Sequence, residues 1–221
     1  MNRYDAMRLF VRAAETANFT QAADSLGVPK ASVSNAVKQL ETMLGVRLFT
    51  RTTRRVALTQ EGQAVQGIAE MHQGLTAYRA TGAKHQLTYL LALLAEGYGR
   101  GGQQEDGLTV LDEALALVDK KGERFYEAEL HRLKGALLLQ QSSSNQTEAE
   151  ACFHQAIRIA QSQQVKSLAL RAATSLARLW QQQGKRQEAH NLLTPVYGWF
   201  TEGFDTADLQ DAKALLNELG A

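Results

Sequence analysis

Cysteine, proline and long apolar runs are scarce in this sequence. The single cysteine, Cys152, excludes a disulfide within the chain. No apolar run approaches the roughly 20 residues that cross a bilayer, and the first residues lack the apolar core of a signal peptide. With 221 residues, 44% of them hydrophobic, and only two prolines, the chain is long enough for a sizeable core and for two modules. We therefore expect a cytoplasmic protein with no membrane partner.

Patterns that would support catalysis are also missing. The histidines show no paired spacing with cysteine or carboxylates, so no metal site is expected. The glycine-rich stretch 97–102 follows no strand and lacks the Lys-Ser/Thr of a phosphate-binding loop, so we interpret it as a turn between helices. No Ser/His/Asp or Cys/His arrangement can be assigned. The sequence thus predicts a protein that is not an enzyme and has no cofactor.

Positive charge is concentrated at one end of the chain, although the formal net charge is only +1. Residues 1–62 contain nine lysines and arginines against five acidic residues. Residues 63–221 contain fifteen basic against eighteen acidic residues. Only the first part therefore has the charge balance of a nucleic-acid-binding module.

Residues 18–44 have the pattern of a helix-turn-helix. Thr20 is placed to cap a short helix, and Gly27 provides the break after it. Pro29 suits the first turn of a second helix, where its missing N–H has no cost. Apolar residues at helical spacing mark the buried side of this second helix: Val33, Ala36, Val37, Leu40 and Leu44.

The opposite side of the second helix carries small, amide and cationic residues, which suit contact with base edges and phosphates in a major groove. Two short strands, 47–49 and 56–58, are expected to follow, joined by an acid-free tip at 50–55 with three arginines and three threonines. Such a tip favours contact with an anionic backbone. The pattern predicts a winged helix-turn-helix that binds double-stranded DNA.

Residues 1–62 resemble the LysR-type bacterial transcriptional regulators. The resemblance is carried by Asp5 to Phe10, Asn18 to Ala23, Leu26-Gly27-Val28, Val33-Ser34, Leu40-Glu41, Leu44 to Phe49, Arg51 to Arg54 and Leu58 to Gly62. It implies that the second helix reads the major groove and that the wing contacts phosphates or the minor groove. The predicted DNA-binding residues are Thr20, Lys30, Ala31, Ser32, Ser34, Asn35, Lys38, Arg51, Thr52, Arg54 and Arg55. Pro29 and Asn35 depart from the family's usual Ser and Arg, which affects the expected base preference because Asn pairs with adenine.

Three columns of residues recur downstream at intervals of 40 to 42 residues, each expected on the second helix of a helix pair. The columns are Gly67, Gly107, Ala149, Ala189; Met71, Leu111, Phe153, Leu193; and Gly74, Ala114, Ala156, Val196. Residues 63–205 resemble a long version of the tetratricopeptide repeat, which implies a stack of helix pairs. Glycines 62, 67 and 74 are expected to interrupt the first helix of this region.

The predicted architecture is mainly α: a winged helix-turn-helix followed by an α-helical tetratricopeptide-like solenoid. Its domains are residues 1–60, with the helix-turn-helix at 19–38 and the wing at 47–58; the repeats, 61–205; and a C-terminal capping helix, 206–221. The function that this architecture predicts is DNA-binding transcriptional regulation, with the repeats serving homodimerisation or a protein partner. The family's usual α/β effector domain is not expected, so no small-molecule inducer is implied.

Two other functions remain open from the sequence. The repeats could form a protein-interaction scaffold to which a non-functional DNA-binding segment is fused, because the two resemblances come from different families. The chain could also be a fragment of an enzyme, since similar repeats occur behind catalytic domains, but it carries no catalytic motif.

Overall fold

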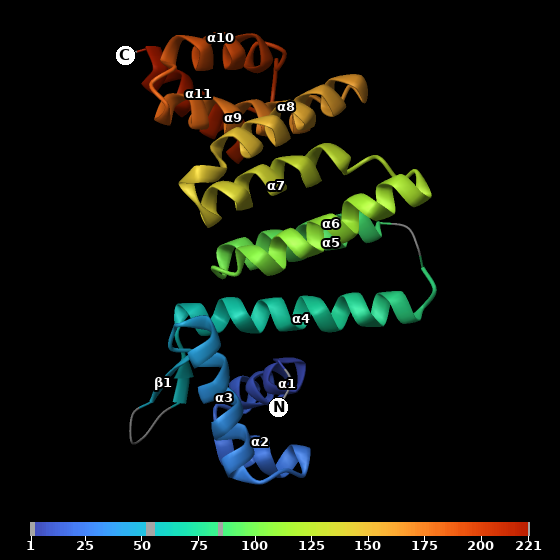
Figure 1. Ribbon diagram of the computed structural model, residues 1–221, viewed down its shortest axis with the longest axis vertical. Coiled ribbons are helices and arrows are strands. Elements are labelled where there is room, and N and C mark those ends of the chain that lie inside the picture. Colours follow the sequence, from blue (N-terminus) through green and yellow to red (C-terminus); the bar gives the residue numbers. More distant parts are fainter. Residues whose placement is uncertain (1–2, 52–55, 84–85, 221) are drawn as a thin grey trace. The chain divides into compact units, whose positions relative to one another are not determined.

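The computed structural model describes residues 3–51, 56–83 and 86–220. It is mainly helical and divides into two compact units, one made chiefly of residues 1–84 and the other chiefly of residues 85–221. The first unit holds α1 (Arg3–Thr16), α2 (Phe19–Leu26), α3 (Lys30–Leu44), β1 (Phe49–Arg51), β2 (Val56–Leu58) and α4 (Gln60–Ala80), in the blue to cyan part of Figure 1. The second holds α5 (Leu87–Arg100), α6 (Gln104–Lys121), α7 (Glu127–Gln141), η1 (Ser143–Asn145), α8 (Gln146–Ser162), α9 (Lys166–Gln182), α10 (Arg186–Tyr197) and α11 (Ala207–Gly220).

The core of the first unit lies between α1, α2 and α3 and extends to the wing and α4. Phe10 on α1 is fully buried, and its ring lies 5.4 Å from that of Phe49 on β1. The Phe49 ring is in turn 5.3 Å from that of Phe19, at the start of α2. Val65 and Ala69 on α4 belong to the same buried cluster. This packing fixes the short β-hairpin to the three helices, because β1 contributes one of the core's aromatic rings.

Helix α4 runs without interruption through all three glycines, contrary to the break expected from the sequence. Gly62 has a packing role, because a Cβ atom there would lie 2.1 Å from the carbonyl oxygen of Leu48. Gly67 and Gly74 have no neighbouring atom within 4 Å of that position. The cost of glycine in a helix is about 1 kcal/mol per residue, which is not enough to end a helix that is held by tertiary contacts.

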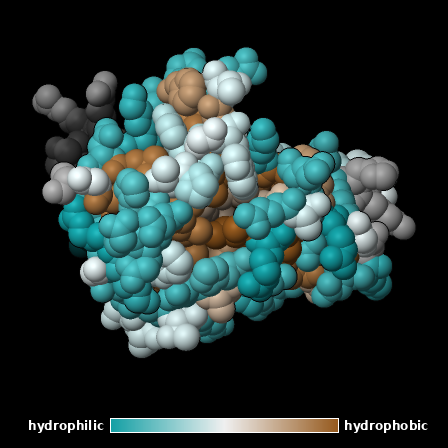
Figure 2. Space-filling model, turned by 90° about the horizontal axis from the view of Figure 1, so that it is seen from above, coloured by the Kyte–Doolittle hydropathy of each residue, from teal (hydrophilic) through white to brown (hydrophobic). Residues whose placement is uncertain are grey.

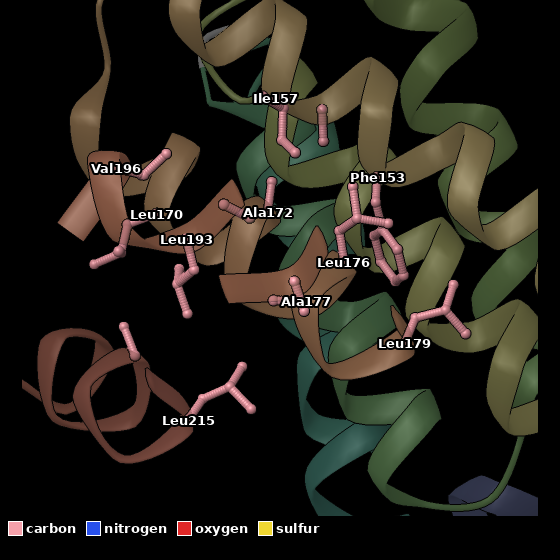
Figure 3. Packing of buried hydrophobic residues seen from close by; sticks show 14 of the residues in the cluster. Phe153, Ile157, Leu170, Ala172, Leu176, Ala177, Leu179, Leu193, Val196 and Leu215 are labelled. Carbon is pink, nitrogen blue, oxygen red and sulfur yellow. The ribbon is translucent and has the colours of Figure 1, made fainter. Parts of the chain in front are cut away.

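The second unit is built from helices that follow one another through short turns, and Figure 1 shows them running back and forth. Gly102, Gly122 and Gly184 occupy turns with φ values of 70°, 70° and 78°, which glycine adopts without strain. The expected closing helix is present as α11, whose Leu209 and Leu219 are buried. Leu215 of α11 belongs to the same buried cluster as Leu193 and Val196 of α10 and apolar side chains of α8 and α9, and Figure 3 shows several of these residues.

Two glycines allow neighbouring helices of this unit to approach closely. A Cβ atom on Gly107 of α6 would lie 3.2 Å from the Ala95 oxygen of α5, and one on Gly135 of α7 would lie 3.0 Å from the Ala149 oxygen of α8. The recurring residues expected on second helices lie on α6, α8 and α10. On these helices, the members of the second and third columns are fully or nearly fully buried: Leu111, Phe153, Leu193, Ala114, Ala156 and Val196. At the corresponding positions on α4, Met71 is half-buried and Gly74 is exposed.

The glycine-rich stretch expected as a turn is mostly helical. Helix α5 continues to Arg100, so that Gly97 and Gly99 lie inside it and the turn begins at Gly101. A Cβ atom on Gly99 would lie 2.6 Å from a methyl carbon of Leu137 on α7. This glycine therefore makes room for a neighbouring helix, which is a long-range requirement.

Polar residues cover most of the outer surface seen in Figure 2, and hydrophobic residues show mainly in the hollows between them. Among the described residues, no helix combines the length and hydrophobicity needed to cross a bilayer. Cys152 on α8 is half-buried, and burial raises the pKa of its thiol, so the thiol stays protonated near neutral pH.

An ion-pair network joins α7, α9 and α11 in the second unit. The buried Glu129 carboxylate accepts hydrogen bonds from Arg132, at 2.9 and 2.7 Å, and forms an ion pair at 2.9 Å with Arg171 of α9. Arg171 also lies 3.7 Å from Asp208 of α11. Burial alone would lower the pKa of Arg132, yet the hydrogen bond and charge of Glu129 raise it. Arg132 therefore stays charged, and both arginines bind the same carboxylate.

Replacing Glu129 with alanine is expected to destabilise the second unit by about 1–3 kcal/mol, because two largely buried guanidinium groups lose their shared partner. The control is Asp112→Ala, which removes the exposed ion pair with Lys134 and should cost less than about 1 kcal/mol. Denaturant unfolding followed by circular dichroism measures both. Equal effects of the two variants would show that the Glu129 network contributes no more than an exposed pair.

Candidate DNA-binding surface

The start of α2 is fixed by Asn18. Its side-chain oxygen accepts hydrogen bonds from the backbone amides of Thr20, at 2.9 Å, and Gln21, at 3.2 Å. The sequence interpretation that Thr20 caps this helix is therefore wrong. Both residue types are good caps, and Asn18 is the one that directly precedes the first helical residue. Thr20 lies instead in the first turn with its side chain exposed.

Helix α3 is held by an apolar stripe at helical spacing. Val33, Ala36, Val37 and Leu40 have exposed fractions of 0 to 1%, and α3 contacts both α1 and α2. Gly27, with φ of 64°, ends α2 so that α3 can begin three residues later. This is the expected helix-turn-helix arrangement, and it leaves one side of α3 free of the core.

The side of α3 away from the core carries the predicted reading residues. Lys30, Ala31, Asn35 and Lys38 are exposed, whereas Ser32 and Ser34 are half-buried. Lys30, Ser34 and Lys38 follow one another at intervals of four residues, so they form a row about 12 Å long. No acidic residue occurs between Asp24 and Glu41, so no fixed negative charge on this stretch opposes DNA.

The first turn of α3 suits an anionic ligand. Pro29 lies directly before the helix, at the capping position, and not in the first turn as expected. Proline has no side-chain acceptor that could cap the first amide groups, and Lys30 and Ala31 follow it at once. A helix start with free amides and a lysine favours phosphate.

The first strand of the wing begins two residues later than expected, and the second strand lies at residues 56–58 as expected. Strand β1 covers Phe49–Arg51 and pairs antiparallel with Val56–Leu58, whereas residues 47–49 were expected as the first strand. Arg47 and Leu48 precede the strand. The Leu48 amide donates to the Glu41 carboxylate, and the carbonyl oxygens of Arg47 and Leu48 accept from Thr59, the residue after β2. The side chain of Thr50 donates to the Ala57 oxygen across the hairpin, at 3.1 Å.

The wing residues predicted to contact DNA are only partly placed. Arg51 is the last residue of β1, which puts its backbone at the outer end of the strand pair. Thr52, Arg54 and Arg55 lie outside the described residues, as does the Arg51 side chain. Their predicted contacts stay predictions.

Helix α1 contributes one arginine to the structure of the domain. The Arg12 guanidinium donates to the Ser25 hydroxyl at 2.8 Å and to the Glu15 carboxylate at 2.9 Å, which connects α1 with the end of α2. Arg8, on the same helix, is exposed. A phosphate contact is therefore more readily assigned to Arg8 than to Arg12.

Sequence reasoning missed three residues around this surface. Asn18 carried the usual preference of Asn for a helix start and could have been identified. Glu41 is among the residues that carry the family resemblance, but it was assigned no role, although its carboxylate accepts a hydrogen bond from the Leu48 amide at 2.9 Å. Arg47 is exposed and lines, with Lys38, a hollow of about 380 Å³ at the end of α3. No local sequence pattern predicts the hydrogen bond of Glu41 or the place of Arg47 beside Lys38, because both depend on the turn that leads into β1.

Among the described residues, no group of three or more His, Cys, Asp or Glu side chains is close enough to hold a metal ion.

Comparison with known proteins agrees with this geometry. Residues 4–63 match the family described as bacterial regulatory helix-turn-helix proteins of the lysR family. An HTH-type transcriptional repressor of Pseudomonas aeruginosa is 52% identical over 64 residues, which is 29% of this chain and 20% of the relative. The glycine cleavage system transcriptional activator of Escherichia coli is 47% identical over 60 residues, 27% of this chain and 20% of the relative.

These matches are confined to the first unit, and the chain spans about a fifth of the length of the curated relatives that it matches. An HTH-type transcriptional regulator of Escherichia coli, YhjC, is 50% identical over 62 residues, a matched length similar to that of the two relatives above. The resemblance to LysR-type regulators inferred from the first 62 residues is confirmed. Residues 4–63 are a LysR-type helix-turn-helix DNA-binding domain.

Proposed function

We propose that this protein is a sequence-specific transcriptional regulator that binds double-stranded DNA through α3 and the wing. The observation that carries the proposal is the exposed side of α3 from Lys30 to Lys38, which has no acidic residue and is held outward by a fully buried apolar stripe on a LysR-type domain. Lys30, Ser34 and Asn35 would read base edges, and the wing arginines would bind phosphates. Whether the protein activates or represses is left open, since its relatives include a repressor and an activator.

We further propose that the second unit is a tetratricopeptide-like module for dimerisation or for a protein partner. The proposal is supported by successive helix pairs, by small residues at close helix crossings and by a closing helix. All regular elements in residues 60–83 and 86–220 are helices, so these segments do not form an α/β effector domain. A dimer would place two copies of α3 on half-sites separated by a helical turn of DNA or a multiple of it. Light scattering is expected to give about twice the chain mass of 24.3 kDa.

The proposed function is tested by selecting bound duplexes from a random library with the purified full-length protein. We expect an enriched motif with two related halves. If repeated rounds return no enriched motif, the protein-interaction scaffold with a non-functional DNA-binding segment becomes the better interpretation.

Replacing Asn35 with alanine is expected to change the selected motif at one position of each half-site. Each good bidentate contact contributes about 1–3 kcal/mol of discrimination, so the preference at that position should weaken by roughly tenfold or more. Asn217→Ala, an exposed asparagine on α11, is the matched control and should leave the motif unchanged. An unchanged motif in the Asn35 variant would show that α3 does not read bases through this residue.

A further inference from the structure

The base of the wing is held by hydrogen bonds from α3 and from Thr59, the residue between β2 and α4. The backbone amide of Leu48 donates to the Glu41 carboxylate of α3 at 2.9 Å. Its carbonyl oxygen accepts from the backbone amide of Thr59 at 3.0 Å. The Leu48 side chain is fully buried in the core of the first unit. The Leu48 amide is therefore bound by α3, outside the hairpin, whereas its carbonyl oxygen is bound by the residue that directly follows β2.

Thr59 extends this attachment to the first turn of α4. Its hydroxyl donates to the Arg47 oxygen at 2.6 Å and accepts from the Gly62 amide at 2.9 Å. Because a Cβ on Gly62 would overlap the Leu48 oxygen, the helix start lies directly against the chain that enters β1. We call this set, Glu41, Leu48, Thr59 and Gly62, the wing anchor.

The wing is a small element that packs on the core through one face. Its two strands contribute three residue pairs, and an isolated two-stranded hairpin is at best marginally stable. Phe49 of β1 lies in the core and Val56 and Leu58 of β2 pack against it, whereas Thr50 and Ala57 are exposed. The bonds that hold Arg47 and Leu48 add to this packing at the point where the chain enters β1.

We propose that Glu41 is a positioning residue that sets the wing relative to α3, so that both can contact one duplex at the same time. Glu41 is on α3, three residues beyond Lys38, and binds the chain at the point where it enters the wing. A shift of the wing base would move every wing arginine relative to the phosphates, while the bases read by α3 would stay the same. This inference rests on the proposed DNA-binding function.

The test compares Glu41→Ala, Glu41→Gln and the control Thr42→Ala in duplex-binding titrations at several salt concentrations. Glutamine can still accept from the Leu48 amide, and Thr42 bonds only to the Lys38 oxygen of its own helix. We expect Glu41→Ala to weaken binding about tenfold and to reduce the slope of log affinity against log salt by about 1 to 2, which indicates lost phosphate contacts. Glu41→Gln and Thr42→Ala should behave like the wild type.

Two further measurements separate positioning from a general loss of folding. Amide exchange at Leu48 should become faster in Glu41→Ala but not in Glu41→Gln, while exchange at Val37 stays slow in both. When Arg51, Arg54 and Arg55 are already alanine, Glu41→Ala should have little additional effect, since the arginine contacts that it positions are gone.

The outcomes distinguish this inference from the function on which it rests. If the wild type binds no duplex, the proposed function fails. If the wild type binds and Glu41→Ala keeps the same affinity and salt slope, Glu41 does not position the wing, although DNA binding stands. Effects of Glu41→Ala that add fully to those of the arginine replacements would also overturn the inference.

Discussion

Replacing Arg51 and Arg54 with alanine is expected to weaken binding to every duplex sequence by about tenfold or more at moderate salt. The reason is electrostatic: each lysine or arginine that neutralises a phosphate releases counterions, so its loss lowers affinity without changing sequence preference. Arg51 ends β1, and Arg54 belongs to the acid-free stretch between the strands. The slope of log affinity against log salt should therefore fall by about 2.

The matched control removes the same charge elsewhere. Lys120 and Lys213 are exposed on α6 and α11 of the second unit, and replacing both with alanine changes the net charge equally. This double variant should keep the salt slope of the wild type. If the two double variants lose affinity and slope to the same extent, binding depends on overall charge and the wing has no special role.

Replacing Phe153 with alanine is expected to destabilise the second unit by about 3–5 kcal/mol. Phe153 on α8 is 1% exposed and packs in the cluster that α8, α9, α10 and α11 share (Figure 3). Its removal combines the lost transfer free energy of the ring with the cost of the cavity left behind. Since a single domain is stable by only about 5–15 kcal/mol, this loss would be visible as a large shift of the unfolding midpoint.

The chain offers a matched phenylalanine for comparison. Phe125, before α7, is 66% exposed, so its replacement by alanine should change stability by no more than about 0.5 kcal/mol. Denaturant unfolding followed by circular dichroism measures both variants. A similar loss in both would contradict the placement of Phe153 in the core.

The helices of the first unit could be predicted because their signals are local. The apolar stripe of α3 repeats at helical spacing, and all of its central members are buried as expected. Thr59 directly precedes α4 and has the usual preference of threonine for a helix start, and its hydroxyl accepts from the Gly62 amide. Each of these features depends on residues within a few positions of one another.

The features that the sequence did not predict depend on contacts between distant segments. Gly62 was interpreted as a weak point of a helix, but it gives room to the Leu48 oxygen. Gly99 was assigned to a turn, yet it lies inside α5 against Leu137. The wing strand was placed two residues early, because the bonds that Arg47 and Leu48 make to Thr59 and Glu41 cannot be seen in an alternating pattern.

The central claim, that the exposed side of α3 enters a major groove, is tested most directly by amide chemical shifts of the labelled protein during titration with its selected duplex. The account predicts the largest changes at Lys30 to Lys38 and at Arg51, a smaller set at the start of α2, and none along α7, α9 or α11. Large changes confined to the second unit, with α3 unaffected at saturation, would contradict it.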